Sequence, residues 1–395
     1  MHTPGPGTPP LRGVRVLEHG SKGPSQFGAM VLADLGADVI RVDRLTALDR
    51  PLAGYDPRLD LLNRGRRSIA LDLRHESGAD LLLRLVRSSD AVIDPFRPGV
   101  TSRLGAGPEE CLAANPGLVY ARMTGWGEDG PYARTAGHDI NFLAASGVLD
   151  LIGRADGGPV PPLNLVGDFG GGGMLLAISV LAGVFASRAG AGGQVVDVAM
   201  LDASALLATV VHTLRAMDSW GPRGTNLLDT GAPYYDVYET ADGGYVSVGA
   251  MERTFYEELL RGVGLDGDPA MLAAHQDRTL WTEAKKRLAE AFRTRTRDEW
   301  AAEFAGRDAC VEPVLNLDEA TEHPQVRHRG IYEPRFGVPQ PAPAPRFTAT
   351  PSSVRRPPPL PGEHTDEILE GLGLSAAERE ELAAAGVLRT GGPTR

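Results

Sequence analysis

The stretch VRVLEHGSKGPSQFGAMVLADLGADVIRV, residues 14–42, decides the fold class. Residues 14–17 form a short apolar run after Gly13, which is typical of a buried strand. From Pro24 to Leu35 the apolar residues recur at helical spacing, and Gly36 is a natural helix end. Residues 39–42 form a second apolar run. This strand–helix–strand order predicts an α/β fold in which a parallel sheet carries helices on its faces.

The same alternation continues outward from this stretch. Further strands are predicted at residues 68–73, 91–93 and 118–120, with a helix at residues 78–86 between the first two. The loop at residues 19–24 matches neither G-x-G-x-x-G nor a Walker sequence. The sequence therefore argues against a nicotinamide cofactor in this loop.

The later part of the chain has a different pattern. Helices are predicted at residues 174–188 and 202–218, with a strand at 194–198 between them. Two aromatic and β-branched runs around Ala241-Asp242-Gly243-Gly244 predict a hairpin over residues 234–248, and two helices follow at 251–262 and 281–293. We therefore expect a second, smaller α+β domain over residues 236–322. Residues 334–361 hold ten of the 31 prolines and predict an extended strap, and Ser375 to Glu378 form a capping box that begins a last short helix.

Composition excludes several classes of protein. The chain has 395 residues and a formal net charge of −11, so the length allows two or three domains and no basic excess favours a nucleic-acid partner. Two cysteines, Cys111 and Cys310, cannot form a disulfide framework or a cysteine zinc site, and they fit a reducing cytoplasm. The N-terminus does not resemble a signal peptide, and the longest apolar run, residues 174–185, is predicted to be too short for a membrane span.

Three residues are candidates for catalysis. His138 lies in a small-residue turn before a hydrophobic helix, Asp168 precedes four glycines, and Glu252 follows a strand and begins a helix. Each also has a structural interpretation: a turn or cap histidine, a helix N-cap, and a first-turn acid that interacts with the helix dipole. The glycines at 170–173 each weaken a helix by about 1 kcal/mol relative to alanine. We expect them to leave space for a bulky group and to offer helix N–H groups to an anionic oxygen.

Segments that span nearly the whole chain resemble one enzyme family. They include MVLADLGADVIRVDR and YARMTGWG in the first half, AGHDINFLAASGVL at residues 136–149, PPLNLVGDFGGGGML at 161–175 and ADGGYVSVGAMERTFY at 241–256. The chain resembles the α-methylacyl-CoA racemase branch of the class III CoA-transferase (CaiB/BaiF) superfamily. The AGHDIN and NLVGDFGGG segments carry the resemblance to the racemase branch in particular.

The resemblance implies an interlocked homodimer. Each chain would have a large Rossmann-like CoA-binding domain, residues 1–195 completed by 337–395, and the small α+β domain of residues 236–322. Residues 196–235 would form a linker helix region, and residues 323–336 a return linker. The active site would lie between the large domain of one chain and the small domain of the other.

The reaction implied by the resemblance interconverts the R and S forms of a 2-methylacyl-CoA by moving one proton, with no metal or redox cofactor. Inversion without a cofactor needs a base on each face of the α carbon. By resemblance, His138 deprotonates the S substrate, Asp168 deprotonates the R substrate, and Glu252 orients the His138 ring. A helix N-terminus lowers the pKa of an aspartate whereas burial raises it, and the sequence leaves open which effect prevails at Asp168.

The resemblance also implies a CoA site rich in arginine, because the guanidinium fork holds phosphate oxygens in pairs. Carried over position by position, the CoA-binding residues are Arg44, Leu71, Asp72, Leu73, Arg74, Pro95, Phe96, Arg97, Arg103, Gly137, Asp139, Ile140, Asn141 and Phe142.

The chain departs from the family pattern at two places, and two alternative functions remain open. Members of the racemase branch read Ile-Glu-Pro where this chain has Met251-Glu252-Arg253, and Asn-Met-Leu-Asp-Gly-Gly where it has residues 226–231, which bears on acyl specificity. The first rival is a true CoA-transferase with Asp168 as nucleophile, because the same fold supports both chemistries. The second is a non-catalytic acyl-CoA binder.

Overall fold

The computed structural model describes residues 7–20, 23–47 and 56–389, so Ser21 and Lys22 of the loop after the first strand lie outside the described residues. The chain divides into two units, each described by itself. Unit 1 comprises residues 1–146, 163–207 and 329–395, and unit 2 comprises residues 147–162 and 208–328. Unit 1 is therefore assembled from three separate segments of the chain.

Unit 1 contains a six-stranded parallel sheet with the strand order β3-β2-β1-β4-β5-β6. The strands are β1 (Arg15–His19), β2 (Asp38–Arg44), β3 (Arg67–Leu71), β4 (Ala91–Asp94), β5 (Val119–Thr124) and β6 (Gln194–Ala199). All five neighbouring pairs are parallel. The predicted α/β class and the six predicted strands of this region are confirmed.

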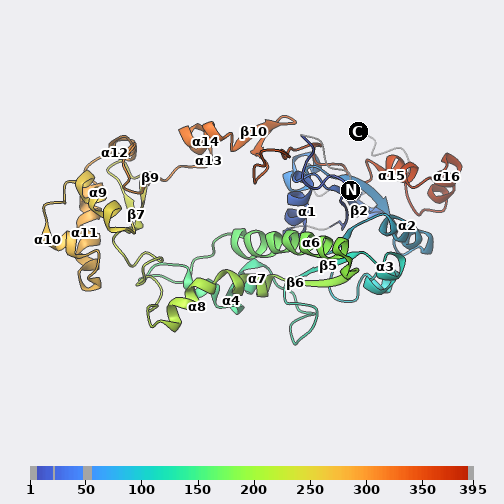
Figure 1. The fold of residues 1–395 in the computed structure, drawn as a ribbon, viewed down its shortest axis with the longest axis horizontal. Helices are drawn as coiled ribbons and strands as arrows, with labels where there is room; N and C mark the ends of the chain where they lie inside the picture. Colours follow the sequence, from blue (N-terminus) through green and yellow to red (C-terminus); the bar gives the residue numbers. More distant parts are fainter. Residues whose placement is uncertain (1–6, 21–22, 48–55, 390–395) are drawn as a thin grey trace. The chain divides into compact units, whose positions relative to one another are not determined.

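Helices cover both faces of this sheet (Figure 1). On one face, Val16, Val39 and Ile93 pack with α1 (Pro24–Asp34) and α6 (Met174–Ala186). On the other, Leu17 and Val92 pack with α2 (Glu76–Arg87), α3 (Pro108–Ala114), α15 (Thr365–Gly371) and α16 (Ala376–Ala384). Successive strand residues alternate between the two cores because side chains on a strand point to opposite faces.

The C-terminal segment of the chain returns to unit 1. The backbone N–H of Gly65 donates to the carbonyl of Arg356, and Leu388 forms a bridge with Leu71 at the end of β3. Helices α15 and α16 lie beside α2 in the ribbon (Figure 1). The predicted strap is mostly extended, but it begins with a short hairpin of β10 (Tyr332–Arg335) and β11 (Val338–Pro341) that the proline content did not predict.

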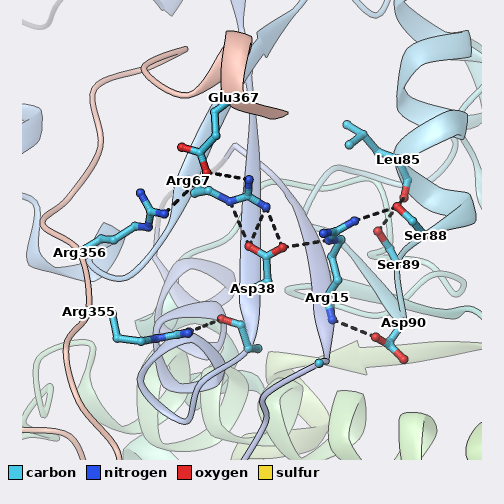
Figure 2. Close-up of polar contacts among 12 residues, drawn as sticks. Arg15, Asp38, Arg67, Leu85, Ser88, Ser89, Asp90, Arg355, Arg356 and Glu367 are labelled. Atoms are coloured by element: carbon cyan, nitrogen blue, oxygen red, sulfur yellow. Dashed lines mark hydrogen bonds and ion pairs between the residues drawn. The ribbon is translucent and has the colours of Figure 1, made fainter. Parts of the chain in front are cut away.

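A network of charged side chains joins the amino-terminal ends of three strands (Figure 2). Asp38 at the start of β2 accepts hydrogen bonds from Arg15 of β1 at 2.9 Å and from Arg67 of β3 at 2.7 Å. Arg67 also pairs with Glu367 of α15 at 3.1 Å. The network thus ties α15 to the sheet, at the edge opposite to the carboxyl ends of the strands.

Unit 2 is a smaller α+β body around an antiparallel sheet in the order β7-β8-β9. Its strands are β7 (Tyr235–Glu239), β8 (Tyr245–Gly249) and β9 (Val311–Pro313). Its core contains Trp281 and Trp300. The helices of unit 2 are α5 (Val148–Leu151), α8 (Thr209–Ala216), α9 (Arg253–Val263), α10 (Pro269–Ala273), α11 (Trp281–Phe292), α12 (Arg297–Phe304), α13 (Leu317–Glu322) and α14 (Pro324–Arg329).

The unit boundaries differ in detail from the predicted domains. Residues 147–162, predicted within the large domain, group with unit 2, where Arg154 pairs with Asp236 at 2.9 Å and Arg223 with Asp150 at 2.7 Å. The prediction of a single helix over residues 202–218 is wrong. Two helices, α7 (Met200–Leu207) and α8, are separated at Ala208, where the chain leaves unit 1.

The helix predicted from residue 174 begins earlier than expected. A wide-turned segment η5 (Leu165–Gly173) runs into α6, and η6 (Ser187–Ala191) extends it. Within the described residues, this continuous helix of 27 residues, Leu165–Ala191, is long and apolar enough to cross a membrane by length and composition alone. The prediction that this apolar segment is too short to span a membrane is therefore wrong. Part of the apolar character of the helix is explained by Leu176 and Val180, which pack in the core of the sheet.

Candidate active site

The strand order places a crevice at the carboxyl ends of β1 and β4. These two strands are neighbours, yet the chain continues from β1 to β2 on one side and from β4 to β5 on the other. In open parallel sheets, ligands bind where the strand order reverses in this way. The residues at these ends therefore border the expected binding crevice: His19 at the end of β1, Asp94 at the end of β4, and Pro95 and Phe96 directly after it.

A cavity of about 480 Å³, which we call the His138 cavity, lies at this crevice. His138 and Asp168 both line it. The remaining lining residues are Gly23, Pro24, Ser25, Pro95, Phe96, Arg97, Pro98, Met123, Thr124, Gly125, Trp126, Ala133, Thr135, Ala136, Gly137, Phe142 and Met200. The structure thus brings together two of the three residues predicted to be catalytic.

His138 lies immediately before helix α4 (Asp139–Ala145), as predicted. Its backbone is extended, and its N–H donates to Oδ1 of Asn141 at 3.0 Å. The imidazole is exposed and does not cap the described helix. A cap formed by the backbone and Asn141 leaves the imidazole available to a ligand in the cavity.

Asp168 lies inside the first turn of η5, so the prediction that it directly precedes the helix is wrong. Its backbone N–H donates to Oδ1 of Asp139 at 2.7 Å, and its Oδ2 accepts from Nδ2 of Asn164 at 3.3 Å. Burial raises the pKa of Asp168, and the charge of Asp139 raises it further, whereas the Asn164 hydrogen bond and His138 act in the opposite direction. At Asp168 burial therefore prevails, and the carboxyl group is easier to protonate than an ordinary aspartate.

The glycines around Asp168 serve packing within the chain. A Cβ on Gly167 would stand 2.6 Å from Oδ1 of Asp139, and a Cβ on Gly173 would stand 2.8 Å from the ring of Phe27 in α1. A Cβ on Gly172 would stand 2.5 Å from Met123. The expectation that these glycines leave room for a ligand is therefore wrong for Gly172 and Gly173. The N–H of Asp168 itself, already donated to Asp139, is not available to an anionic oxygen.

A second cavity of about 310 Å³, the Arg44 cavity, adjoins the carboxyl ends of β1, β2 and β3. Arg44 and Arg74 are its cationic lining residues, and the other lining residues are His19, Gly20, Val42, Asp43, Leu45, Thr46, Leu71, Asp72, Leu73, Phe96 and Leu104. Phe96 lines both cavities, and the guanidinium carbon of Arg44 lies 5.3 Å from the centre of its ring. The side chain of Phe96 therefore marks the place where the two cavities approach each other.

The predicted CoA-binding residues divide between these cavities with some exceptions. Arg44 and Leu71 to Arg74 line the Arg44 cavity, whereas Pro95, Arg97, Gly137 and Phe142 line the His138 cavity. Arg103, Asp139, Ile140 and Asn141 line neither. Asp139 instead accepts from the Asp168 backbone, and Asn141 from that of His138, so these two side chains hold the candidate bases in position.

Glu252 lies in unit 2 at the N-terminus of α9, and its side chain is exposed. The preceding carbonyl, that of Met251, is 2.9 Å from Nε2 of His275. The negative charge of Glu252 also contributes, after burial, to raising the pKa of the Cys310 thiol. Among the described residues, no group of three or more His, Cys, Asp or Glu side chains could hold a metal ion.

Two lining residues that the sequence analysis did not single out have a buried, unpaired side-chain nitrogen. Trp126 lines the His138 cavity, and its buried Nε1–H has no hydrogen-bond partner among the described residues. His19 lines the Arg44 cavity, and its buried Nε2 also has no hydrogen-bond partner among the described residues. An isolated tryptophan or histidine in the sequence gives no sign that its polar atom is left unpaired in the fold.

The family model of CoA-transferase family III matches residues 11–365. The chain belongs to this family. Within CoA-transferase family III, the α-methylacyl-CoA racemases of Mus musculus and Homo sapiens are each 43% identical to it over 376 residues, which cover 94% of this chain and 96% of each relative. The resemblance noted in the sequence is thus confirmed. A solved structure of a CaiB/BaiF family protein from Brucella suis superposes with a TM-score of 0.76 at 26% identity, covering 92% of this chain and 100% of that one.

Proposed function

We propose that the protein is an α-methylacyl-CoA racemase, an isomerase that interconverts R- and S-2-methylacyl-CoA thioesters. The observation that carries this proposal is that His138 and Asp168 line one cavity. Two proton-transfer groups at one site meet the requirement of a one-carbon inversion. The 43% identity to two racemases over nearly the whole chain supports the same reaction.

In the proposed reaction the α proton of the S substrate passes to His138, and the electron pair of the C–H bond becomes an enolate. Protonated Asp168 then delivers its proton to the opposite face, which re-forms a C–H bond with inverted configuration. In the reverse direction the two groups exchange roles. The raised pKa of Asp168 supports this, because its carboxyl group must carry a proton at one stage of each cycle. Because these steps move only a proton, the proposed reaction uses no cofactor.

We propose that the CoA part of the substrate occupies the Arg44 cavity while the thioester lies in the His138 cavity. Arg44 and Arg74 are the cationic groups for its phosphates, and Arg74, which pairs with Asp72 at 3.0 Å in this structure, would turn to the phosphate when CoA binds. Phe96 lines both cavities, so a ligand that extends past it could reach from one to the other.

We further propose that the protein acts as a homodimer, in which Glu252 orients the His138 ring of the partner chain. Unit 1 supports an interface, because it exposes large apolar side chains of the kind that an oligomer would bury. These side chains are Leu163, Leu165, Met174, Ile178, Phe185, Val195, Leu206 and Leu207. Light scattering coupled to size exclusion tests this directly, and a monomer at micromolar concentration would contradict it. A cytoplasmic location, consistent with the two free cysteines, is also proposed.

One experiment separates racemase, CoA-transferase and acyl-CoA binder. A single 2-methylacyl-CoA epimer is incubated with the protein in heavy water without a second acid, and the product is followed by NMR and mass spectrometry. A racemase incorporates deuterium at the α carbon and produces the other epimer. A transferase does neither until an acceptor acid is added, and a binder does neither at all; either result would contradict the proposal.

A further inference from the structure

His19 is a buried residue at the place where the parallel sheet forms its binding crevice. It is the last residue of β1, and it is 2% exposed. Its ring centre lies 5.6 Å from that of Phe96, in the segment that follows β4. The ring therefore lies at the carboxyl end of β1, near the segment that follows the neighbouring strand β4, and it also lines the Arg44 cavity.

The imidazole of His19 has an unsatisfied hydrogen-bonding atom. Nε2 is buried and has no partner in the part of the chain that the structure describes. Nearby Asp94 does not satisfy it, because the Asp94 carboxylate accepts from the N–H of Phe96 at 3.0 Å, from Thr101 at 2.7 Å and from Tyr120 at 2.9 Å. A buried polar atom without a partner costs free energy, which a ligand that supplies the missing partner recovers.

The same surroundings indicate which kind of ligand group this is. Burial lowers the pKa of His19 more than the charge of Asp94 raises it, so the ring is uncharged near neutral pH. In a neutral imidazole Nε2 offers one hydrogen bond rather than a charge, as donor or acceptor according to the tautomer. Arg44 and Arg74 are the cationic lining residues of this cavity, whereas His19 and Phe96 are its aromatic lining residues, with the Arg44 guanidinium over the Phe96 ring.

We propose that His19 recognises the adenosine part of CoA, through a hydrogen bond between Nε2 and the base or ribose. This role rests on the proposed function, since it presumes a CoA thioester as substrate. It makes His19 a binding and specificity residue, distinct from the groups that line the His138 cavity. A purely structural role would leave the unpaired nitrogen unexplained.

The test is calorimetric titration of three ligands into the full-length protein: CoA, dephospho-CoA, which lacks the 3′-phosphate, and 4′-phosphopantetheine, which lacks adenosine. His19→Leu removes the hydrogen bond but retains an apolar side chain. We expect it to weaken CoA and dephospho-CoA equally, by about three- to tenfold, and to leave 4′-phosphopantetheine unchanged. His19→Gln, which keeps a donor and an acceptor, should bind CoA within about twofold of the wild-type protein.

Each other result overturns the proposal. If His19→Leu binds CoA with wild-type affinity, His19 does not contact the ligand. If the affinity for all three ligands falls equally, His19 contacts the pantetheine part. A loss larger for CoA than for dephospho-CoA would place the contact on the 3′-phosphate. A His19→Gln variant no better than His19→Leu would rule out the hydrogen bond.

His364 provides a matched control, because it is a partly buried histidine of unit 1 whose Nδ1 accepts from the N–H of Ser68 at 3.2 Å. It lines neither cavity. His364→Leu should lower the unfolding temperature but leave the affinity for CoA unchanged. If His19→Leu does not fold, ¹⁵N-histidine NMR of the wild-type protein replaces it. The Nε2 resonance of His19, assigned with His19→Gln, should then shift with CoA and dephospho-CoA but not with 4′-phosphopantetheine, and an unshifted resonance would overturn the proposal.

The failure of this inference is distinct from the failure of the proposed function. If the wild-type protein does not bind CoA at all, the proposed function itself is contradicted. If the wild-type protein binds CoA and epimerises its thioester while the His19 variants bind equally well, only the assignment of His19 is wrong.

Discussion

At the scale of single residues, the two candidate bases are held by side chains next to them in the same site. Asn141 accepts from the backbone of His138, and Asp139 accepts from the backbone of Asp168. The sequence predicted both bases through the family resemblance, but it assigned Asp139 and Asn141 to CoA. The chemistry of a short polar side chain is the same in both roles, so only the fold distinguishes a ligand contact from a backbone contact.

His138→Ala should reduce epimerisation by about 10²–10⁴-fold, since a positioned acid–base group is lost. Because the exposed ring leaves the α4 cap intact, the thermal unfolding and the CoA affinity of the variant should match the wild-type protein. The loss of α-deuterium incorporation from the S epimer is the measurement. A variant that keeps more than about a tenth of the rate would exclude His138 from proton transfer.

Asp168→Asn should abolish epimerisation and change how stability depends on pH. Burial raises the pKa of Asp168 in the folded state, so the folded protein binds this proton more tightly than the unfolded chain does. The ionised carboxylate therefore destabilises the fold increasingly as pH rises from the unfolded pKa through the folded pKa. We expect the unfolding free energy of Asp168→Asn, relative to the wild-type protein, to increase over that interval and then level off. Urea unfolding at pH 3 to pH 7 measures this difference in free energy. A difference that stays constant over the range would contradict the raised pKa of Asp168.

At the scale of elements, the strands were predictable because each is a short apolar run buried on both faces of a parallel sheet. The start of a helix at residue 165, ahead of Asp168, was not, because the five glycines of residues 165–173 lower helix propensity. Tertiary packing overrides that propensity, since the missing side chains let η5 contact Phe27 of α1 and Met123 of β5 closely. The break at Ala208 was equally hidden, because the change from unit 1 to unit 2 has no local sequence signal.

Gly167→Ala should lower kcat by about tenfold or more, because its new methyl group would stand 2.6 Å from Oδ1 of Asp139 and displace the acceptor that holds Asp168. Gly170→Ala on the same helix is the control, since its methyl group would meet only the carbonyl of Leu165, at 3.0 Å. Steady-state kinetics of both variants checks this. Equal activity in the two would show that the Asp139 contact does not position Asp168.

Asp38→Asn should lower the stability of the sheet at neutral pH but not at acidic pH. Burial alone would raise the pKa of Asp38, but the hydrogen bonds and charges of Arg67 and Arg15 outweigh it and hold the pKa below its usual range. The stability that ionised Asp38 contributes is therefore present above its unfolded pKa and is lost as pH falls through its folded pKa. Urea unfolding should separate the variant from the wild-type protein at pH 7, and the difference in unfolding free energy should disappear as pH falls through the folded pKa of Asp38.

At the scale of the whole molecule, a second α+β domain was predictable from the change in secondary-structure pattern, and the return of the C-terminal segment was predicted only through the family resemblance. The hairpin at residues 234–248 and the proline-rich segment both lie where the sequence indicated. The reassignment of residues 147–162 was not predictable, because it depends on ion pairs such as Arg154 with Asp236 that join residues far apart in the sequence.

Co-expression of His138→Ala and Glu252→Ala chains tests the proposed dimer. If Glu252 serves the His138 of its partner, a mixed dimer contains one site without either substitution, and activity should recover to a fraction of the wild-type level. Two different affinity tags allow the mixed species to be purified before its epimerase assay. Verified mixed dimers without any recovered activity would place Glu252 in the site of its own chain, or outside it.

The return of the C-terminal segment has a consequence for biosynthesis. The last strand of the large sheet ends at residue 199, but α15, which packs with α2 and α3 on the Leu17 and Leu71 face of that sheet, begins only at residue 365. At typical elongation rates of about 5–20 residues per second, the ribosome needs roughly 10 to 30 seconds to synthesise the intervening chain. During that interval α2 and α3 cover this face without α15 and α16, so part of its apolar surface stays exposed. Chaperones that bind exposed apolar surface should therefore associate with ribosome-bound chains of intermediate length and leave once translation is complete.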